Sequence, residues 1–371
     1  MRFKQNPLIT PSDVKASRPD YEVVCVFNPA VTIYRDEIIL LLRVAERPIQ
    51  TNGYISVGVL DVNSSRGDYE NIHISREAES LNDKDCRVIN YKGQSYTTTI
   101  SHLRIARSKD GVNFKIEDKP FISASGVHDR YGVEDARITQ IDNDYYITFA
   151  SISSEGVSTA LAKTSDWKSY EYLGIIFAPM NKDVVIFPRK INGKYIAVHR
   201  PDAGEFARPS MWLASSPDLS HWGESSLLMK TRDNMWDSHR IGAGSVPVET
   251  EKGWLSIYHG CNEFSEYRLG LLLQAKNDPS KIIFRSSEPL MSAEEEYEQN
   301  GFFNHVVFTD GLAYFPEQDR IFLYYGAADL CVCGAEFSFS QLLSKTDGGY
   351  KNPDRNFSDR LSSKTSKISN I

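Results

Sequence analysis

The sequence lacks any long apolar run. In this chain of 371 residues the most apolar stretch is residues 38–42, which has the length of a strand, whereas a helix that spans a bilayer needs about 20 apolar residues. The N-terminal residues contain no apolar signal segment. Cysteine is scarce as well, and its five copies are an odd number. We therefore expect a cytoplasmic protein with reduced thiols and no membrane-spanning helix.

An excess of positive charge is also absent. The formal net charge is −7, which argues against general binding of nucleic acid or an anionic membrane but leaves room for a basic cluster that binds an anion inside a cleft. We expect no metal site, because Cys331 and Cys333 alternate on one predicted strand and should be buried as small apolar groups. Hydrophobic residues make up 41% of the chain, which is typical of a globular protein with a large core.

Helical periodicity is weak outside residues 292–299 and 339–343. Five segments instead share one design, in which a turn of small residues, a short strand, a polar turn and an aromatic-rich strand follow one another. A second hairpin follows most of these segments, so each unit predicts a four-stranded antiparallel sheet. The units begin near Phe27, Gly132, Val185, Gly242 and His305.

Five units spaced by roughly 50 to 65 residues are typical of the blades of a β-propeller. The first interval is longer and predicts an insertion between Pro48 and His102. A pair of packed β-sheets is the alternative, which the regular spacing disfavours. We therefore predict an all-β fold, a five-bladed β-propeller with short helical additions, as a single catalytic domain over residues 1–345. Residues 346–371 are rich in Ser, Lys, Asn and Asp and are predicted to form a mobile tail.

Charged and polar residues stand at repeat-equivalent positions. The innermost strands of a propeller all start at one central funnel, so these side chains are expected to converge. Asp135 is the sharpest candidate, because a carboxyl group in a partly desolvated funnel can act as a general acid. A turn Asp that accepts backbone hydrogen bonds is the alternative. The strand starts carry Asn28, Glu134, Asp135, Lys182, Asp183, Arg240 and His305, and the ends of the paired strands carry Arg43, Arg200, His259 and Asp329.

A basic set and a group of aromatic residues are the other two features. Lys182, Arg200, Arg240 and His259, with Arg43 nearby, would repel one another unless an anion or carboxylates lay between them. Arg and Lys both bind phosphate well, and pairing with Asp or Glu across blades is the alternative. Aromatic faces such as those of Tyr267 and Phe308 stack on sugars, although most aromatic residues here are expected in the blade cores.

Taken together, these residues resemble glycoside hydrolase family 130. Each matching string is weak alone, but their order and spacing over residues 6–343 are specific. The string Arg-Val-Ala-Glu-Arg-Pro at 43–48 and the opening Asn6 to Pro11 are similar to the branch that acts on β-1,2-linked mannosides. The other matching strings are Phe-Asn-Pro-Ala at 27–30, Gly-Val-Glu-Asp-Ala-Arg at 132–137, Phe-Pro-Arg-Lys at 187–190, Tyr-His-Gly at 258–260 and Tyr-Tyr-Gly-Ala-Ala-Asp at 324–329.

The resemblance implies a five-bladed propeller that catalyses inverting phosphorolysis of β-mannosides, most of all β-1,2-linked manno-oligosaccharides, to α-mannose 1-phosphate and a shortened saccharide. It implies that Asp135 is the general acid and protonates the glycosidic oxygen through the 3-hydroxyl of the −1 mannose. Inorganic phosphate is the co-substrate, and no cofactor or metal is expected. The implied phosphate-binding residues are Lys182, Arg200, Arg240, His259, Asn28 and Arg43, and the implied substrate-binding residues are Glu134, Asp329, Tyr267, Phe308 and Arg137.

Some positions depart from the family pattern. Lys182 stands where an Arg is usual and Arg240 where a Lys is usual, so both can still carry positive charge. Pro29 stands where some relatives have a hydroxyl residue, which makes one phosphate contact of the family less certain for this chain, and Ala136 replaces a common Pro, which affects only the turn.

Two other functions remain open from the sequence. One is a β-1,2-mannosidase of the same family, with Glu134, Asp183 or Asp237 as the base, and the other is a non-catalytic sugar-binding propeller. The expected partners are a mannose-containing oligosaccharide and phosphate, without nucleic acid or membrane. Strand edges and the insertion after Pro48 can support a homo-oligomer.

Overall fold

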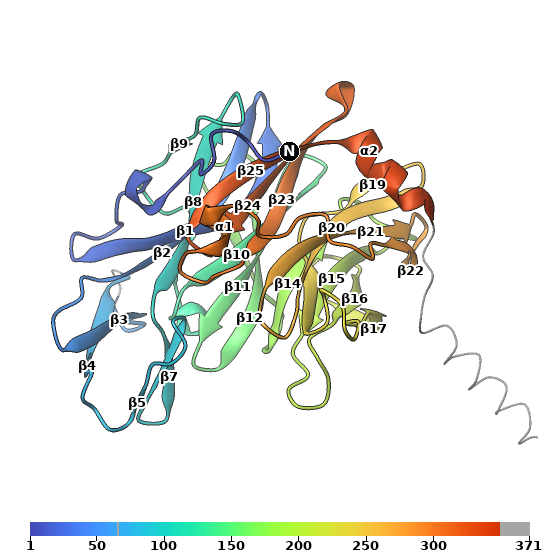
Figure 1. Ribbon diagram of the computed structural model, residues 1–371. Helices are drawn as coiled ribbons and strands as arrows, with labels where there is room; N and C mark the ends of the chain where they lie inside the picture. The colour runs from blue at the N-terminus through green and yellow to red at the C-terminus, as the bar shows by residue number, and fades with distance from the viewer. Residues whose placement is uncertain (65–66, 349–371) are drawn as a thin grey trace, which may run out of the picture.

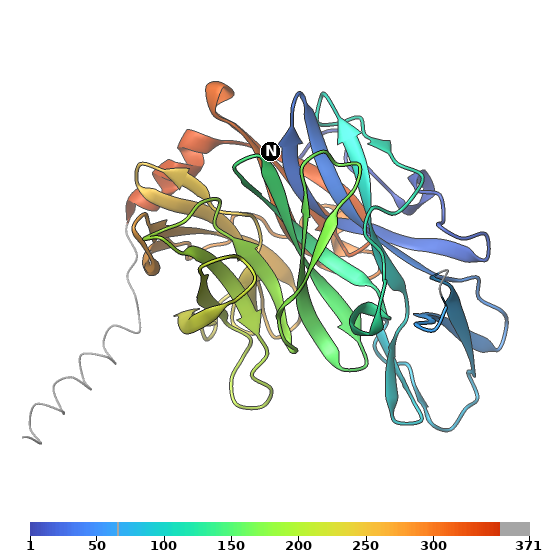
Figure 2. The ribbon, with the colours of Figure 1, turned by 180° about the vertical axis from the view of Figure 1, so that it is seen from behind.

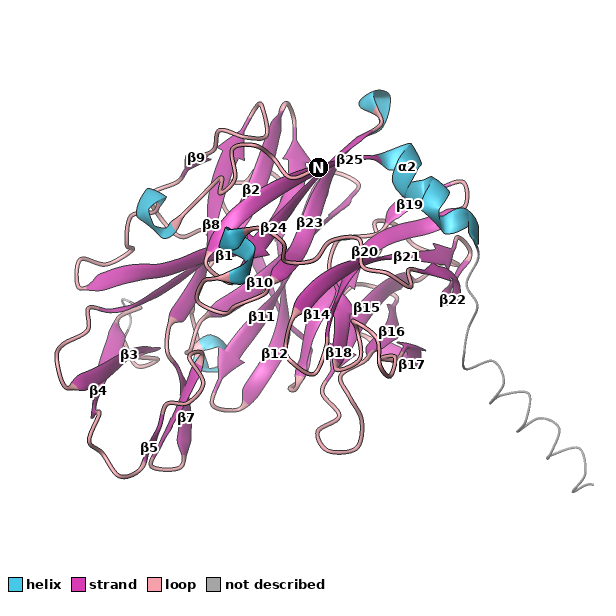
Figure 3. Cartoon of the chain, viewed as in Figure 1, coloured by secondary structure: helices cyan, strands magenta, loops and turns pink. Residues whose placement is uncertain are grey.

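The computed structural model describes residues 1–64 and 67–348. Strands dominate this part of the chain and helices are short (Figure 3), which confirms the predicted all-β class. The expected helical segments correspond to α1 (Glu296–Gln299) and α2 (Phe339–Ser344). Short 3-10 helices occur at Pro11–Asp13, Val127–Asp129, Pro316–Gln318 and Lys345–Gly348.

Five antiparallel sheets follow one another along the chain. Sheet 1 contains β1 (Tyr21–Tyr34), β2 (Glu37–Pro48), β8 (Ile100–Ser108) and β9 (Lys115–Ile116). Sheet 2 contains β10 (Val133–Ile141), β11 (Asp144–Ser153), β12 (Gly156–Thr164) and β13 (Glu171–Phe177). Sheet 3 contains β14 (Asn181–Ile186), β15 (Tyr195–Pro201), β16 (Met211–Ser216) and β17 (Gly223–Met229).

The last two sheets vary this plan. Sheet 4 contains β18 (Arg240–Ala243), β20 (Gly253–Cys261), β21 (Tyr267–Ala275) and β22 (Asp278–Arg285), with β19 (Val248–Thr250) beside β20. Sheet 5 contains β23 (Val307–Phe315), β24 (Arg320–Ala327) and β25 (Cys331–Ser338). Successive sheets that each run outward from a first strand form a propeller-like arrangement.

The apolar core is divided among the spaces between neighbouring sheets. Clusters of buried side chains join sheets 1 and 2, 2 and 3, 3 and 4, 4 and 5, and 5 and 1. The run at 38–42 is apolar throughout because both faces of β2 are buried: Ile39 and Leu41 face sheet 2, whereas Leu40 and Leu42 face sheet 5. Figures 1 and 2 show sheet 2, in green, between sheet 1 and sheet 3 from both sides.

The first strands of the sheets lie near one another. Strand β1 contacts both β10 and β23, β10 contacts β14, and β14 contacts β18. Strands β20 and β21 of sheet 4 also contact β23. Contacts between first strands therefore lead around the molecule from sheet 1 to sheet 4, and sheet 4 meets sheet 5 through its next two strands.

The N-terminal segment completes sheet 5. Figure 1 places the N-terminus beside β25, where Arg2 and Ile9 form bridges to Ala335 and Val332. The Asn6 side chain donates to the Gly334 carbonyl at 2.9 Å and accepts from the Gly334 amide at 2.8 Å, as a strand neighbour would. Residues at the start of the chain therefore supply the outer edge of the last sheet.

The predicted insertion is present between β2 and β8. It contains the hairpin β3 (Tyr54–Leu60) and β4 (Tyr69–Ser75), and a small sheet of β5 (Leu81–Asn82), β6 (Val88–Tyr91) and β7 (Gln94–Thr97). Figure 1 shows it projecting beyond one end of sheets 1 and 2.

Two expectations concern the cysteines and the end of the chain. The five cysteines are free, and Cys331 and Cys333 are buried between sheets 4 and 5, as predicted. In the described residues, no helix combines the length and the apolar character that crossing a membrane would need. Of the predicted tail at 346–371, only residues 346–348 are described, in a 3-10 helix with Thr346 buried, and the remainder lies outside the described residues.

Candidate active site

One local distortion recurs in the first strands. The pairing register shifts between Phe27 and Ala30 in β1, and between Glu134 and Arg137 in β10. Equivalent shifts occur between Lys182 and Val185 in β14 and between Phe308 and Gly311 in β23. Each shift is a β-bulge, which bends a strand and changes where its side chains point.

Three of these bulges begin with a residue of left-handed backbone conformation. The φ angles of Asn28, Asp135 and Asp183 are +44°, +47° and +55°. Asn and Asp tolerate this region better than most other residues, which explains why these two residue types recur here. The bulges bring polar groups of sheets 1, 2 and 3 to the centre of the molecule.

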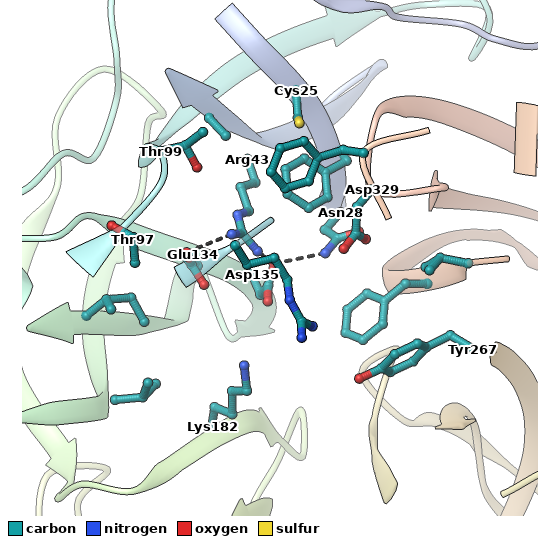
Figure 4. A pocket seen from close by; sticks show the side chains of 18 of the residues that line it. Cys25, Asn28, Arg43, Thr97, Thr99, Glu134, Asp135, Lys182, Tyr267 and Asp329 are labelled. Carbon is teal, nitrogen blue, oxygen red and sulfur yellow. Dashed lines mark hydrogen bonds and ion pairs between the residues drawn. The ribbon is translucent and has the colours of Figure 1, made fainter. Parts of the chain in front are cut away.

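A cavity of about 270 Å³ lies at this centre. Side chains from all five sheets and from the insertion surround it (Figure 4). Of the predicted residues, the cavity is lined by Asn28, Arg43, Glu134, Asp135, Lys182, Asp183, Arg200, Arg240, Tyr267, Phe308 and Asp329. The predicted convergence is therefore observed for most of the set. The exceptions are Arg137 and His259, which do not line the cavity, and His305, which is exposed and also lies outside it.

Asp135 is held from one side. Its Oδ1 accepts from Arg43 Nη1 at 2.9 Å and from Asn28 Nδ2 at 3.0 Å, and the other arm of Arg43 binds Glu134 Oε1 at 2.6 Å. Burial raises the pKa of Asp135, but the charges of Arg43, Lys182 and Arg137 outweigh it and lower the pKa to about 2. These protein charges therefore favour the carboxylate form of Asp135 at neutral pH.

Two basic residues of the cavity have no carboxylate partner in the described part of the chain. Lys182 makes neither a hydrogen bond nor an ion pair there, and burial, together with the charge of Arg200, lowers its pKa. Arg240 donates from Nη1 to Tyr267 Oη at 3.0 Å. Figure 4 shows the Lys182 amine pointing into the space beside Asp135. Positive charge thus faces the cavity on the side opposite Arg43.

The other basic residues of the site lie beside carboxylate groups. Asp183 lies 2.9 Å from Arg200 Nη1 and 3.2 Å from His259 Nε2. His259 is fully buried, 4.3 Å from the ring of Phe308 between centroids. Burial lowers the pKa of His259 to about 4, so it is neutral at pH 7, in contrast to the charge expected from the sequence. The pairing alternative therefore holds for Arg43 and Arg200 but not for Lys182 or Arg240.

Gly242 makes the contact between Asp183 and His259 sterically feasible. A Cβ at this position would lie 2.2 Å from Asp183 Oδ2 and 2.5 Å from His259 Nε2. Both distances are far below van der Waals contact, so a side chain here would displace one of the two groups. Gly242 thus allows the close approach of sheets 3 and 4 at this point.

The remaining wall combines a carboxyl group with aromatic rings. Burial raises the pKa of Asp329 to about 6, against the opposing charge of Arg43. Tyr267 and Phe308 meet edge to face with centroids 6.0 Å apart. This wall offers hydrogen-bonding groups and an apolar face to the same small volume, an arrangement suited to a sugar.

Residues of the insertion also line the cavity, although the sequence pattern did not indicate them. They are Asp85, Arg87, Val88, Thr97 and Thr99. Arg87 pairs with Asp85 and lies 4.4 Å from the Phe303 ring. These positions have no counterpart in the other units, so the repeat that identified the other residues contained no signal for them.

Asp237, which the sequence analysis offered as a base, lies outside the cavity. It is fully buried and accepts hydrogen bonds from Arg232, Arg285 and Tyr258. These partners occupy both of its oxygens in a network within sheet 4.

Comparison with known proteins defines the class of this chain. Residues 80–347 match the model of glycoside hydrolase family 130, described as β-1,4-mannooligosaccharide phosphorylase. The chain therefore belongs to glycoside hydrolase family 130.

The chain is also similar in sequence and structure to individual proteins. The chain is 41% identical over 350 residues to a β-1,2-mannobiose phosphorylase of Listeria innocua, covering 93% of this chain and 98% of the relative. It is 38% identical over 240 residues to a 1,2-β-oligomannan phosphorylase of Thermoanaerobacter sp., covering 64% of this chain and 78% of that protein. The solved structure of the Listeria innocua enzyme with β-1,2-mannobiose matches with a TM-score of 0.89 over 93% of this chain and 98% of that chain.

Proposed function

We propose that this protein is an inverting phosphorylase that cleaves β-1,2-linked manno-oligosaccharides with inorganic phosphate. The observation that carries the proposal is the positive charge of Lys182 and Arg240, two half-buried side chains without a carboxylate partner among the described residues, in the cavity that also holds Asp135. Because neither side chain is paired with a carboxylate within the described residues, both can bind an anion. The names of the relatives support phosphate as the anion and a β-1,2-mannoside as the sugar.

We further propose that the five sheets close into a five-bladed propeller within one catalytic domain over residues 1–345. The ring of contacts from β1 through β10, β14 and sheet 4 to β23 supports this arrangement. The N-terminal segment, by pairing with β25, joins the start of the chain to its last blade. In such a ring the bulged strands deliver their polar residues to one funnel.

In the proposed reaction, phosphate lies against Lys182, Arg200 and Arg240 and attacks the anomeric carbon from the face opposite the leaving group. Inversion gives α-mannose 1-phosphate. Asp135 supplies the proton for the departing oxygen, through the 3-hydroxyl of the −1 mannose as the family resemblance implies. Asn28 and Arg43 hold the carboxyl group in place, and the basic residues reduce the repulsion that phosphate meets in a site rich in oxygen atoms.

The protonation of Asp135 follows from the same charges. Its low pKa is due to Arg43, Lys182 and Arg137, and a phosphate dianion between Lys182 and Arg200 offsets part of that positive charge. The pKa of Asp135 therefore rises when phosphate binds. We infer that the acid gains its proton as the co-substrate binds, with no cofactor.

The hydrolase alternative requires a carboxylate free to activate water. Asp183 is matched with Arg200 and His259, Glu134 is bound by Arg43, and Asp237 lies outside the cavity. None of the three is free within the described residues, which disfavours each of them as the base of a hydrolase. A purely sugar-binding role does not account for an acid and uncompensated cations in one cavity.

Phosphate dependence tests the proposal directly. We expect β-1,2-mannobiose to be consumed only when phosphate is present, with release of α-mannose 1-phosphate and mannose. A panel of β-mannobioses of other linkages, assayed in parallel, measures the linkage preference. Equal consumption in phosphate-free buffer, with free mannose as the sole product, would establish the hydrolase instead. The cytoplasmic location and a homo-oligomeric state remain predictions.

A further inference from the structure

Beneath the cavity lies a buried ion pair that does not line it. The side chains of Arg137 on β10 and Asp310 on β23 are 2% and 0% exposed, and Arg137 Nη2 lies 2.6 Å from Asp310 Oδ1. Within the described residues neither oxygen of Asp310 accepts a well-aligned hydrogen bond. Burial raises the pKa of Asp310 well above its usual range, despite the opposing charge of Arg137. Among the described residues, Arg137 is thus the ion-pair partner that Asp310 has.

Arg137 connects this pair to the main chain of the candidate acid. Its Nη1 donates to the carbonyl oxygen of Asp135 at 2.9 Å. Its Nη2 donates to the carbonyl oxygen of Ala243 at 3.1 Å and lies 3.4 Å from Asp183 Oδ1. One guanidinium therefore joins the first strands of sheets 2, 3, 4 and 5.

The main chain of Asp135 needs such support. Its φ of +47° is disfavoured for a residue with a side chain. Residues 135 and 136 also lie in the bulge, so they have no register partner on β11. A strained conformation persists only where its surroundings stabilise it. The hydrogen bond from Arg137 to the carbonyl oxygen of Asp135 stabilises this peptide directly.

We propose that Arg137 and Asp310 are positioning residues, which fix the Asp135 main chain from below and thereby set the direction in which its carboxyl group faces the sugar. Asp310 acts through Arg137, and Arg137 acts through the carbonyl of Asp135. This inference rests on the proposed function, because it assigns the pair to the proton transfer in phosphorolysis.

Exchange of either residue tests the inference. We expect Arg137→Lys and Asp310→Ala to reduce kcat for β-1,2-mannobiose about 10- to 100-fold, because a displacement of about 1 Å can have an effect of this size. The KM for phosphate should stay within about threefold, since neither residue lines the cavity. Asp310→Asn keeps an oxygen beside Arg137 and should restore kcat to within about threefold of the wild type.

Arg285→Lys is the matched control. Arg285 has a 2% exposed side chain and an ion pair of 2.6 Å to Asp237, the same burial and length as the pair under test, but it is remote from Asp135 in the hydrogen-bond network. It should lower the melting temperature without lowering kcat. All variants are compared by thermal melting, so that loss of folded protein is separated from loss of turnover.

A substrate with an activated leaving group separates positioning of the acid from general damage. With 2,4-dinitrophenyl β-mannoside and phosphate, the leaving group departs without a proton, so Arg137→Lys and Asp310→Ala should retain about half or more of the wild-type rate. If the wild-type enzyme does not accept this substrate, the contrast of Asp310→Ala with Asp310→Asn and Arg285→Lys decides alone.

The outcomes separate the two proposals. Unchanged kcat in Arg137→Lys and Asp310→Ala, equal losses with both substrates, or an equal loss in Arg285→Lys would overturn the positioning role. Wild-type protein that shows no phosphate-dependent turnover would instead overturn the proposed function.

Discussion

Removal of the Lys182 charge is the most direct probe of the phosphate site. The side chain is half-buried, lines the cavity and makes no ion pair within the described residues, so solvent screens its interaction with a bound anion less than it would at an exposed site. A hydrogen bond to a charged group contributes about 1.5–3 kcal/mol. Since about 1.4 kcal/mol corresponds to a factor of ten, Lys182→Met should lower kcat/KM for phosphate about 10- to 150-fold.

The assay is the initial rate of α-mannose 1-phosphate release at saturating β-1,2-mannobiose over a range of phosphate concentrations. Lys182→Arg keeps the charge and should recover part of the loss. Lys109→Met is the control, because Lys109 is exposed and binds Asp36 far from the cavity lining, and its phosphate dependence should equal that of the wild type. An unchanged KM and kcat for phosphate in Lys182→Met would refute the assignment of this side chain to the anion.

Three further predictions concern the acid, the closure of the fold and the pH dependence. Asp135→Asn should lose about 10²- to 10⁴-fold in kcat while its melting temperature stays close to that of the wild type; full activity would remove Asp135 from its role. Asn6→Ala breaks both bonds to Gly334 and should lower the free energy of unfolding by about 1–3 kcal/mol in urea titrations, whereas Gln5→Ala should not. The pKa of Asp329 is raised on folding to about 6, so its contribution to stability is present below pH 4 and is lost as the pH rises through 6. The melting temperature of Asp329→Asn relative to that of the wild type should therefore rise between pH 4 and 7, and a constant difference would mean that Asp329 does not titrate in this range.

The sequence predicted the sheets because they repeat. Turns, alternation and aromatic-rich strands recur at similar intervals, and the same intervals predicted that Asn28, Asp135 and Lys182 would converge. Arg43 and Arg200 also occupy equivalent positions in the repeat. Arg43 pairs with Phe27 and Arg200 pairs with Lys182, and each of these partners is the residue that precedes a bulge. Recurring positions in a repeated fold can be compared with one another even when only one sequence is known.

Whether each of these side chains lines the cavity or lies behind its lining could not be predicted in the same way. In a regular strand, Asp135 and Arg137 would point to the same side, and both were expected in the site. The bulge between Glu134 and Arg137 breaks this alternation, so Arg137 lies beneath the cavity. His259 lies opposite Gly242 on β18, which has no such bulge in the paired region, and it packs behind Asp183. Asn or Asp marks three of the bulges, but these residues are equally common at turns, so the sequence does not distinguish a bulge from a turn.

The arrangement of charge explains why acid and anion site share one cavity. Arg43 serves two carboxylates, Arg200 is matched by Asp183, and Lys182 and Arg240 have no carboxylate partner among the described residues. With Asp329 protonated, which its raised pKa allows in mildly acidic solution, positive charge is in slight excess. A phosphate dianion more than balances that excess, and a proton on Asp135 removes the surplus negative charge. Binding of the nucleophile and protonation of the acid are therefore coupled through Arg43 and Lys182, so a cavity that already held a balanced set of ion pairs would lose that coupling.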